Sequence, residues 1–142
     1  MQLTRYTDYS LRVLIFLSLQ EGEQRITITN IAEQFNIPRN HLVKVVHKLG
    51  KLNYINTIRG KNGGVSLGKA ADQIRIGDVV QKMENTLDIV KCESPSPCPL
   101  IPSCKLKSIL HNAADAFIHT LNQYTIADLQ QAPDQLKVLL RM

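Results

Sequence analysis

Residues 27–51 read TITNIAEQFNIPRNHLVKVVHKLGK, and this stretch decides the fold. Thr27 can cap a first helix whose apolar residues recur at helical spacing until the Asn-Ile-Pro break at residues 36–38. A second helix is predicted over residues 39–51, with one apolar face. Its other face carries Asn40, Lys44, His47 and Lys51. Two short helices joined by a tight turn, the second with a basic outer face, are typical of a helix-turn-helix.

A β-hairpin is predicted immediately after these helices. Residues 54–58 are rich in β-branched and aromatic side chains, residues 59–64 form the turn-prone sequence Arg-Gly-Lys-Asn-Gly-Gly, and residues 65–67 alternate again. Such a hairpin would be the wing of a winged helix, and Arg59 and Lys61 could then reach phosphate or the minor groove. A plain hairpin turn is the alternative. A nucleotide-binding loop is disfavoured, because the glycines lack Walker spacing and no helix follows at once.

Positive charge is concentrated in the first half of the chain. The 142 residues include 17 Lys and Arg against 12 Asp and Glu, for a net charge of +5. Residues 1–70 hold ten basic and four acidic side chains, or +6, whereas residues 71–142 hold seven and eight, or −1. This asymmetry favours a polyanionic partner for the first half.

Helices are also predicted on either side of this unit. One runs from Tyr6 to Gln20 with Asp8 in its first turn, where a carboxylate is favoured by the helix dipole. A short one covers residues 76–84, and a long one of roughly twenty residues, about 30 Å, follows residue 105. The broad apolar stripe of the long helix predicts a dimerisation helix, with packing inside one chain as the alternative.

The expected fold is therefore mainly α with a small β-hairpin: a winged helix-turn-helix domain plus a long dimerisation helix. The expected divisions are a DNA-binding domain at residues 1–80, a cysteine loop and dimerisation helix at 81–130, and a peripheral tail at 131–142. No membrane-spanning run and no export signal are recognised, so we expect a cytoplasmic protein in a reducing compartment.

All three cysteines lie in one proline-rich loop. Cys92, Cys98 and Cys104 are separated by five residues each, and four of the six prolines lie between them. In a reducing compartment such thiols are soft ligands for an iron-sulfur cluster or zinc. The spacing is wider than in structural zinc sites, which favours a cluster with one ligand that is not cysteine. Redox thiol chemistry and inert cysteines are the alternatives; an enzyme is disfavoured, because Cys-x-x-Cys is absent.

These features together resemble one family. They are YTDYSLR at residues 6–12, the predicted winged helix, Arg-Asn-His at 39–41, RGKNGG at 59–64, RIGDVV at 75–80 and the spaced cysteines. The combination resembles the iron-sulfur-responsive winged-helix repressors, most closely their nitric oxide-sensitive members, over residues 1–130.

The resemblance implies a homodimer that binds double-stranded operator DNA while its cluster is intact and releases it when nitric oxide attacks the iron. It implies Cys92, Cys98 and Cys104 as ligands, with Asp8 of the other subunit as the fourth. A 4Fe-4S cluster is favoured over 2Fe-2S. Lys107 occupies the position of a histidine ligand in the related regulator of iron-sulfur biogenesis. The expected DNA contacts are Arg39, Asn40, His41 and Lys44 on the recognition helix and Arg59 and Lys61 on the wing.

Two other functions stay open at this point. A regulator of the same family could sense iron-sulfur or redox status, although Lys107 argues against the iron-sulfur biogenesis type. A DNA-binding protein could instead carry a structural zinc, which would be colourless where iron-sulfur proteins are brown or red.

Overall fold

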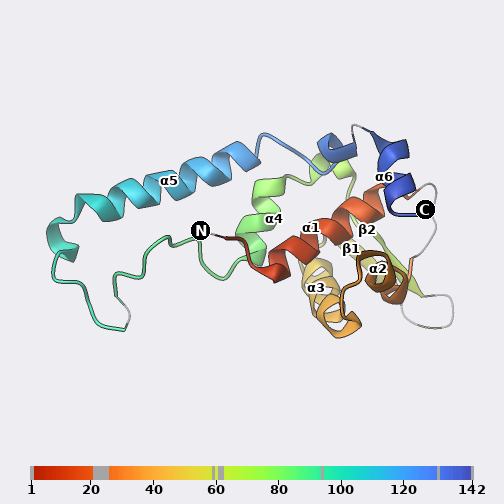
Figure 1. The fold of residues 1–142 in the computed structure, drawn as a ribbon, viewed down its shortest axis with the longest axis horizontal. Helices are drawn as coiled ribbons and strands as arrows, with labels where there is room; N and C mark the ends of the chain where they lie inside the picture. Colours follow the sequence, from red (N-terminus) through yellow and green to blue (C-terminus); the bar gives the residue numbers. More distant parts are fainter. Residues whose placement is uncertain are drawn as a thin grey trace.

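The computed structural model describes residues 2–20, 26–58, 60, 63–93, 95–130 and 132–141, and within them the chain forms six α-helices and one two-stranded hairpin. The helices are α1 (Arg5–Ser18), α2 (Ile28–Phe35), α3 (Arg39–Lys51), α4 (Ile76–Met83), α5 (Lys105–Leu121) and α6 (Pro133–Leu139). The strands are β1 (Ile55–Ile58) and β2 (Gly64–Leu67), and 3-10 turns occupy Ala71–Gln73, Ile101–Ser103 and Ala127–Gln130. The mainly helical fold with a small hairpin is confirmed (Figure 1).

Helices α2 and α3 form the predicted helix-turn-helix. Thr27 caps α2 in a reciprocal arrangement: the Asn30 N–H donates to Thr27 Oγ1 at 3.1 Å, and the Thr27 N–H donates to Asn30 Oδ1 at 3.2 Å. Asn36 ends α2 with φ of 50°, a left-handed conformation that asparagine tolerates. Ile37 is then buried, and Pro38 directly precedes α3. The turn therefore uses the asparagine and proline that the sequence indicates.

The hairpin packs beside these helices as a wing does. The strands pair antiparallel with Ile55 opposite Leu67. The segment before α2 adds a bridge, in which the Val65 N–H donates to Ile26 O at 2.8 Å. The first strand starts one residue later than predicted, because the Tyr54 N–H donates to Leu49 O at the end of α3 at 3.0 Å. Arg59 and Lys61, the predicted wing contacts, lie outside the described residues.

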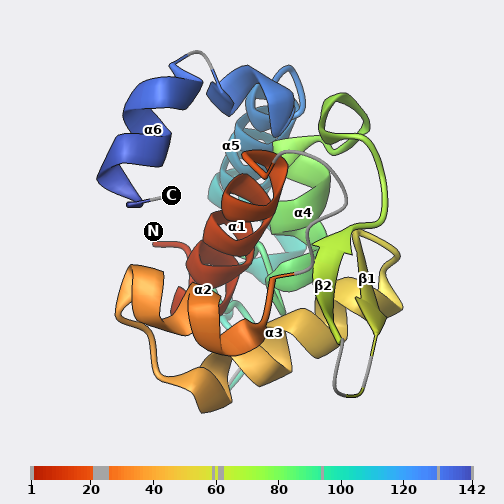
Figure 2. The same cartoon turned by 90° about the vertical axis from the view of Figure 1, so that its right-hand side faces the viewer.

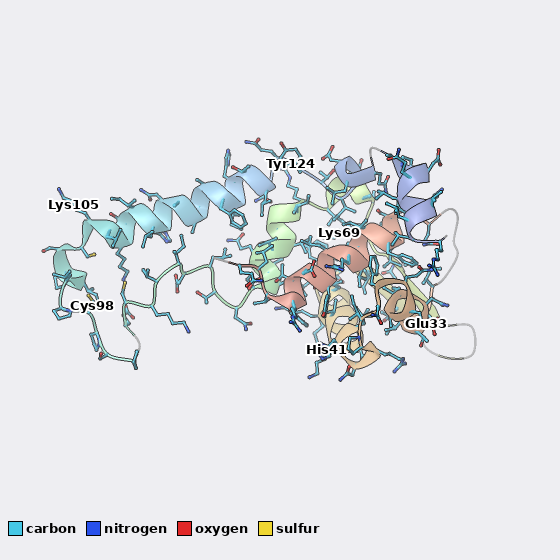
Figure 3. The ribbon with its side chains drawn as sticks, viewed as in Figure 1. Glu33, His41, Lys69, Cys98, Lys105 and Tyr124 are labelled. Carbon is cyan, nitrogen blue, oxygen red and sulfur yellow. The ribbon has the colours of Figure 1, made fainter. Side chains whose placement is uncertain are left out.

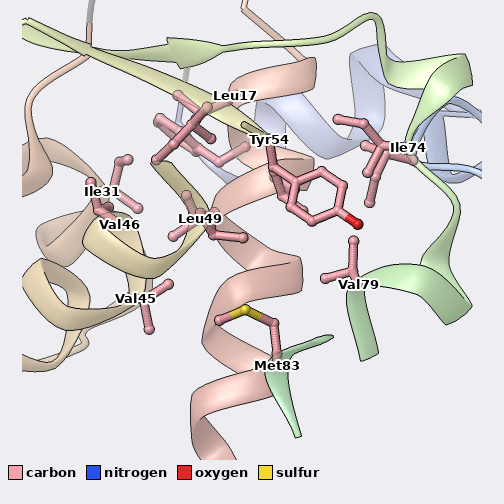
Figure 4. Close-up of a cluster of buried hydrophobic side chains, with 14 of the residues drawn as sticks. Leu17, Ile31, Val45, Val46, Leu49, Tyr54, Ile74, Val79 and Met83 are labelled. Carbon is pink, nitrogen blue, oxygen red and sulfur yellow. The ribbon is translucent and has the colours of Figure 1, made fainter. Parts of the chain in front are cut away.

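Helix α1 is the centre of the core. Figure 2 shows it with α2 and α3 below and α4 beside it. Val13 and Leu14 are completely buried, and Phe16 and Leu17 nearly so. Figure 4 shows Leu17 beside Leu49 and Tyr54, with Ile74, Val79 and Met83 closing the other side. Each large aliphatic side chain buried in this way contributes about 1.5–3 kcal/mol. The structure begins α1 at Arg5 and ends it at Ser18, slightly before the predicted bounds.

Helix α5 and the preceding segment form an arm, residues 84–121, that projects from this core (Figure 1). The helix has 17 residues instead of the roughly twenty expected, because it ends at Leu121 before Tyr124. Only Ile118, near its C-terminal end, is buried, whereas Leu106 and Ile109 are 60% and 61% exposed. The apolar stripe predicted for this helix is thus largely uncovered in a single chain.

A capped turn and a short helix follow α5. Thr125 and Asp128 form the cap: the Thr125 N–H donates to Asp128 Oδ2 at 2.7 Å. The cap opens the 3-10 turn Ala127–Gln130, and the α-helix α6 lies in the segment expected to be a peripheral tail. Among the described residues, no helix has the length and apolar character needed to cross a membrane.

Candidate nucleic-acid interface and cysteine loop

The start of α3 presents the predicted DNA-contacting residues together on one exposed surface. Arg39, Asn40, His41 and Lys44 are all exposed there. Arg39 Nε donates to Thr29 Oγ1 of α2 at 3.2 Å, which restrains the guanidinium across the helix-turn-helix. The His41 N–H donates to Asn40 Oδ1 at 3.0 Å. The N-cap residue Pro38 offers no side-chain cap, and the positive end of the helix dipole together with the basic side chains creates a positive surface suited to phosphate.

A shallow groove separates this surface from the hairpin. Its lining residues include Thr29, Arg39, His47, Thr57 and Gly63. The groove therefore has hydroxyl, guanidinium and imidazole groups along its walls, which is the mixture used against sugar-phosphate and base edges. Thr29 was missed from the sequence, since its role appears only once α2 and α3 are packed.

Asp8 lies in the first turn of α1, as predicted, and is paired with Arg12. Arg12 Nε donates to Asp8 Oδ1 at 3.0 Å, and Arg12 Nη2 lies 2.9 Å from Asp8 Oδ2. The carboxylate is 44% exposed, so this pair is screened by solvent and is worth about 0–1 kcal/mol. Arg12 was not singled out from the sequence, although its spacing of four residues from Asp8 is the signal for such a pair. The Asp8 carboxylate is therefore accessible to solvent, and its ion pair with Arg12 is weak.

The turn that carries Asp8 is held from two directions. The Thr4 N–H donates to Glu84 Oε1 at 2.8 Å, which joins the start of α1 to the end of α4. On the other side, the Tyr6 hydroxyl donates to Lys44 O of α3 at 3.0 Å. The Tyr9 ring lies 6.3 Å from the ring of His41, centre to centre. The sequence carries no local signal for these contacts, because they join residues far apart in the chain.

The cysteine loop, residues 92–104, lies at the far end of the arm (Figure 3). Its three thiols are free; Cys98 is exposed, and Cys92 and Cys104 are partly buried. The Cys98 N–H donates to Cys92 O at 2.9 Å, which folds the loop back on itself, and Cys104 immediately precedes α5. Lys107 Nζ lies 3.5 Å from Glu93 Oε1, so this lysine is engaged with the loop through a carboxylate.

The donor set of the loop suits iron-sulfur ligation, but a single chain does not complete a site. Three thiols in one folded-back loop are the soft donors that such clusters take. Within the part of the chain that the structure describes, no three His, Cys, Asp or Glu side chains converge closely enough to hold a metal ion. Asp8 lies on α1, away from the end of the arm that bears Cys98 (Figures 1 and 3). The residues therefore fit the group only when the loop closes and a further ligand arrives from elsewhere.

Comparison with known proteins agrees with this geometry. Residues 3–132 match the model of the Rrf2 family, described as an iron-dependent transcriptional regulator. The chain belongs to the Rrf2 family. It is accordingly a DNA-binding transcription regulator, consistent with the predicted repressor, and not an enzyme, as the sequence analysis expected.

Relatives in this family match along the whole chain. The HTH-type transcriptional regulator NsrR of Halalkalibacterium halodurans is 46% identical over 144 residues, covering 100% of this chain and 99% of that protein. NsrR of Bacillus subtilis is 44% identical over 144 residues, with the same coverage. The predicted likeness to the nitric oxide-sensitive members is thus confirmed by relatives that bear the NsrR name.

Solved structures support the same architecture. The oxidized form of Staphylococcus aureus CymR aligns with a TM-score of 0.73 at 26% identity, covering 92% of this chain and 97% of that one. CymR, the global cysteine regulator of B. subtilis, aligns with a TM-score of 0.70 at 25% identity over 91% of this chain and 95% of that one. IscR of T. potens shares the fold, with a TM-score of 0.73 at 20% identity. The alignment covers 92% of this chain and 87% of the IscR chain.

Proposed function

We propose that the protein is a nitric oxide-sensing repressor that binds operator DNA as a homodimer while it holds an iron-sulfur cluster. The observation that carries the proposal is the pairing of two separate features in one chain: a basic helix-turn-helix surface and a distant loop of three free thiols. A regulator needs both a DNA-contacting surface and a place where a signal acts. The NsrR name of full-length relatives supports nitric oxide as that signal.

In this proposal Cys92, Cys98 and Cys104 hold the cluster, and Asp8 of the partner subunit supplies the fourth ligand. A 4Fe-4S cluster is favoured over 2Fe-2S. When bound, the cluster would supply an iron with a comparatively weak oxygen ligand, where nitric oxide can bind. Asp8 suits the role because it is half-exposed, and its release from Arg12 costs little.

The homodimer is supported by the exposed face of α5. Leu106 and Ile109 are each about three-fifths exposed, and Ile89 and Val90 in the preceding segment are 37% and 43% exposed. Two neighbouring hollows lie between that segment and α5, and Leu87, Asp88 and Ile89 line both. An apolar helix beside such hollows suits a second copy of the same arm. A dimer would also present two α3 helices to successive half-sites.

The DNA contacts follow from the same assembly. Arg39, Asn40, His41 and Lys44 would read base edges in the major groove, and Arg59 and Lys61 would contact phosphate or the minor groove. The tie between Asp8 of one subunit and the loop of the other would set the spacing of the two recognition helices. Loss of that tie would let the dimer adopt a second geometry with lower operator affinity.

The test is non-denaturing mass spectrometry on protein isolated without oxygen, together with operator binding, during stepwise addition of nitric oxide. A dimer with one cluster per chain that takes up nitric oxide and loses operator affinity supports the proposal. A zinc-loaded or metal-free dimer without nitrosyl adducts would refute it. In the same assay Asp8→Ala should lower cluster retention, and Asp134→Ala on exposed α6 is the matched control; equal retention in both variants would remove Asp8 from the ligand set.

A further inference from the structure

Tyr6 makes a directional contact between the first helix and the recognition helix. It is partly buried on α1, and its hydroxyl donates to Lys44 O of α3 at 3.0 Å, across 38 residues of sequence. The hydroxyl is therefore a donor aimed at one backbone carbonyl.

The ring of Tyr6 takes part in a second contact, through Lys48. The Lys48 ammonium lies 5.6 Å from the centre of the Tyr6 ring, a cation-π distance. The same ammonium donates to Met83 O at the end of α4 at 3.4 Å. Tyr6 and Lys48 thus connect α1, α3 and α4, and we name this pair the three-helix node.

The three-helix node lies between the turn that carries Asp8 and the recognition helix α3. Tyr6 lies two residues before Asp8 in the first turn of α1. Lys44, whose carbonyl it holds, projects from the exposed face of α3 that we assign to DNA. We propose that Tyr6 is a positioning residue that fixes α3 to the Asp8 turn, so that a change at Asp8 alters the placement of α3. This inference rests on the proposed function and names the residue through which it is transmitted.

The hydroxyl matters because apolar contacts between α1 and α3 lack direction. Side chains such as Val13 and Val45 are fully buried in the core, and burial of apolar surface is non-directional. A hydrogen bond weakens steeply when its donor and acceptor are misaligned. The Tyr6 hydroxyl therefore adds a directional restraint on the register of the two helices to the packing of the core.

The experiment compares Tyr6→Phe with Tyr54→Phe as a matched control. Each variant removes one hydroxyl and keeps its ring. Tyr54 likewise has a lysine partner: Lys82 Nζ donates to its hydroxyl at 3.2 Å and lies 5.2 Å from its ring centre. Unlike the Tyr6 hydroxyl, which bonds to α3, the Tyr54 hydroxyl accepts its hydrogen bond from Lys82 of α4. Operator affinity is measured for the cluster-loaded and cluster-free dimers, and amide hydrogen exchange of residues 39–51 is followed in both states.

The expected result is a loss of about three- to tenfold in operator affinity for loaded Tyr6→Phe, the equivalent of one hydrogen bond. The cluster-free form of Tyr6→Phe should bind operator as the cluster-free wild type does. The ratio of operator affinities between the cluster-loaded and cluster-free dimers should therefore be smaller than in the wild type. The difference in amide hydrogen exchange of α3 between the loaded and cluster-free dimers should also become smaller in Tyr6→Phe. Tyr54→Phe should keep the wild-type affinity ratio and the wild-type exchange difference.

Two results would overturn the role of Tyr6. An equal loss in both states would make it a general structural residue, and unchanged affinity and exchange would make it dispensable. A wild-type dimer that binds operator equally well with and without its cluster would instead refute the proposed function, and the wild-type arm alone reveals that outcome.

Discussion

Gly77→Ala should destabilise the protein through the junction between α4 and α5. A Cβ at Gly77 would meet the side-chain amide of Asn122 and would lie 2.7 Å from Ile118 O, a backbone atom that cannot rotate away. Overpacking of this kind costs about 1–3 kcal/mol. Alanine is favoured over glycine in a helix by about 0.5–1 kcal/mol, which offsets part of the cost. The net loss should therefore lie between about 0 and 2.5 kcal/mol.

Gly50→Ala is the matched control for this substitution. Gly50 is also helical, but a Cβ there would meet only Thr57 Cγ2, at an ordinary contact distance of 3.9 Å. Gly50→Ala should therefore be stabilised by about 0.5–1 kcal/mol, because alanine is favoured over glycine in a helix and the new Cβ meets no clash. Both variants share the helical preference for alanine over glycine. The difference between their free energies of unfolding therefore reports the steric clash of the Gly77 Cβ at the junction of α4 and α5.

The assay is urea unfolding of the cluster-free protein under reducing conditions, followed by far-ultraviolet circular dichroism. Protein concentration is held equal across variants, because any dimer makes stability concentration-dependent. If Gly77→Ala unfolds at the same urea concentration as Gly50→Ala, the close packing at the junction is wrong. Asn122→Ala in the Gly77→Ala background should restore only part of the loss, since Ile118 O remains in place.

Three further outcomes can be checked with standard methods. Leu14→Ala, at a fully buried position, should cost about 2–5 kcal/mol in the same urea assay. Lys61→Ala should weaken operator and random DNA alike and reduce the salt slope of binding by about 1, whereas Arg39→Ala should also relax base preference in a competition assay; equal losses would refute this division. Hydrogen bonds from the Thr125 backbone and then its hydroxyl lower the pKa of Asp128, so its stabilisation is present above the unfolded pKa and is lost as pH falls through the folded value. Asp128→Asn should therefore flatten the acid limb of the stability profile.

The helix-turn-helix could be predicted from the sequence because its determinants are local. Thr27 caps the helix that it precedes, and the Asn36 to Pro38 break lies between two runs of helical periodicity. Helix α3 consequently has the predicted bounds. Periodicity also located α5, but its end was misplaced because Tyr124 continues the apolar pattern after the helical hydrogen bonds have stopped at Leu121.

The contacts around the candidate site could not be predicted, since they depend on packing between distant segments. Glu84 accepts from the Thr4 N–H across 80 residues, and no spacing rule connects them. Tyr6 has the periodicity of an ordinary helix residue, and only the packing of α1 against α3 gives its hydroxyl a partner. The sequence therefore supplied candidate ligands and DNA contacts, whereas the structure supplied the residues that hold them in position.

The attachment of the arm constrains how a signal can travel from the cysteine loop. The segment that follows α5 is joined to the start of α4 and the residues before it by backbone hydrogen bonds: the Ile76 N–H donates to Tyr124 O at 3.0 Å, and the Ile126 N–H donates to Ile74 O at 2.9 Å. The loop lies at the other end of the 17-residue helix, about 25 Å away at 1.5 Å per residue. These bonds anchor the chain at the end of α5 opposite the loop, and we infer that α5 is poorly placed to carry a change in the loop back to its own helix-turn-helix. In the proposed dimer, Asp8 of the partner subunit offers a shorter route, because it lies in the same turn as the Tyr6 contact to α3. In the proposed dimer each cluster would therefore control chiefly the recognition helix of the opposite subunit.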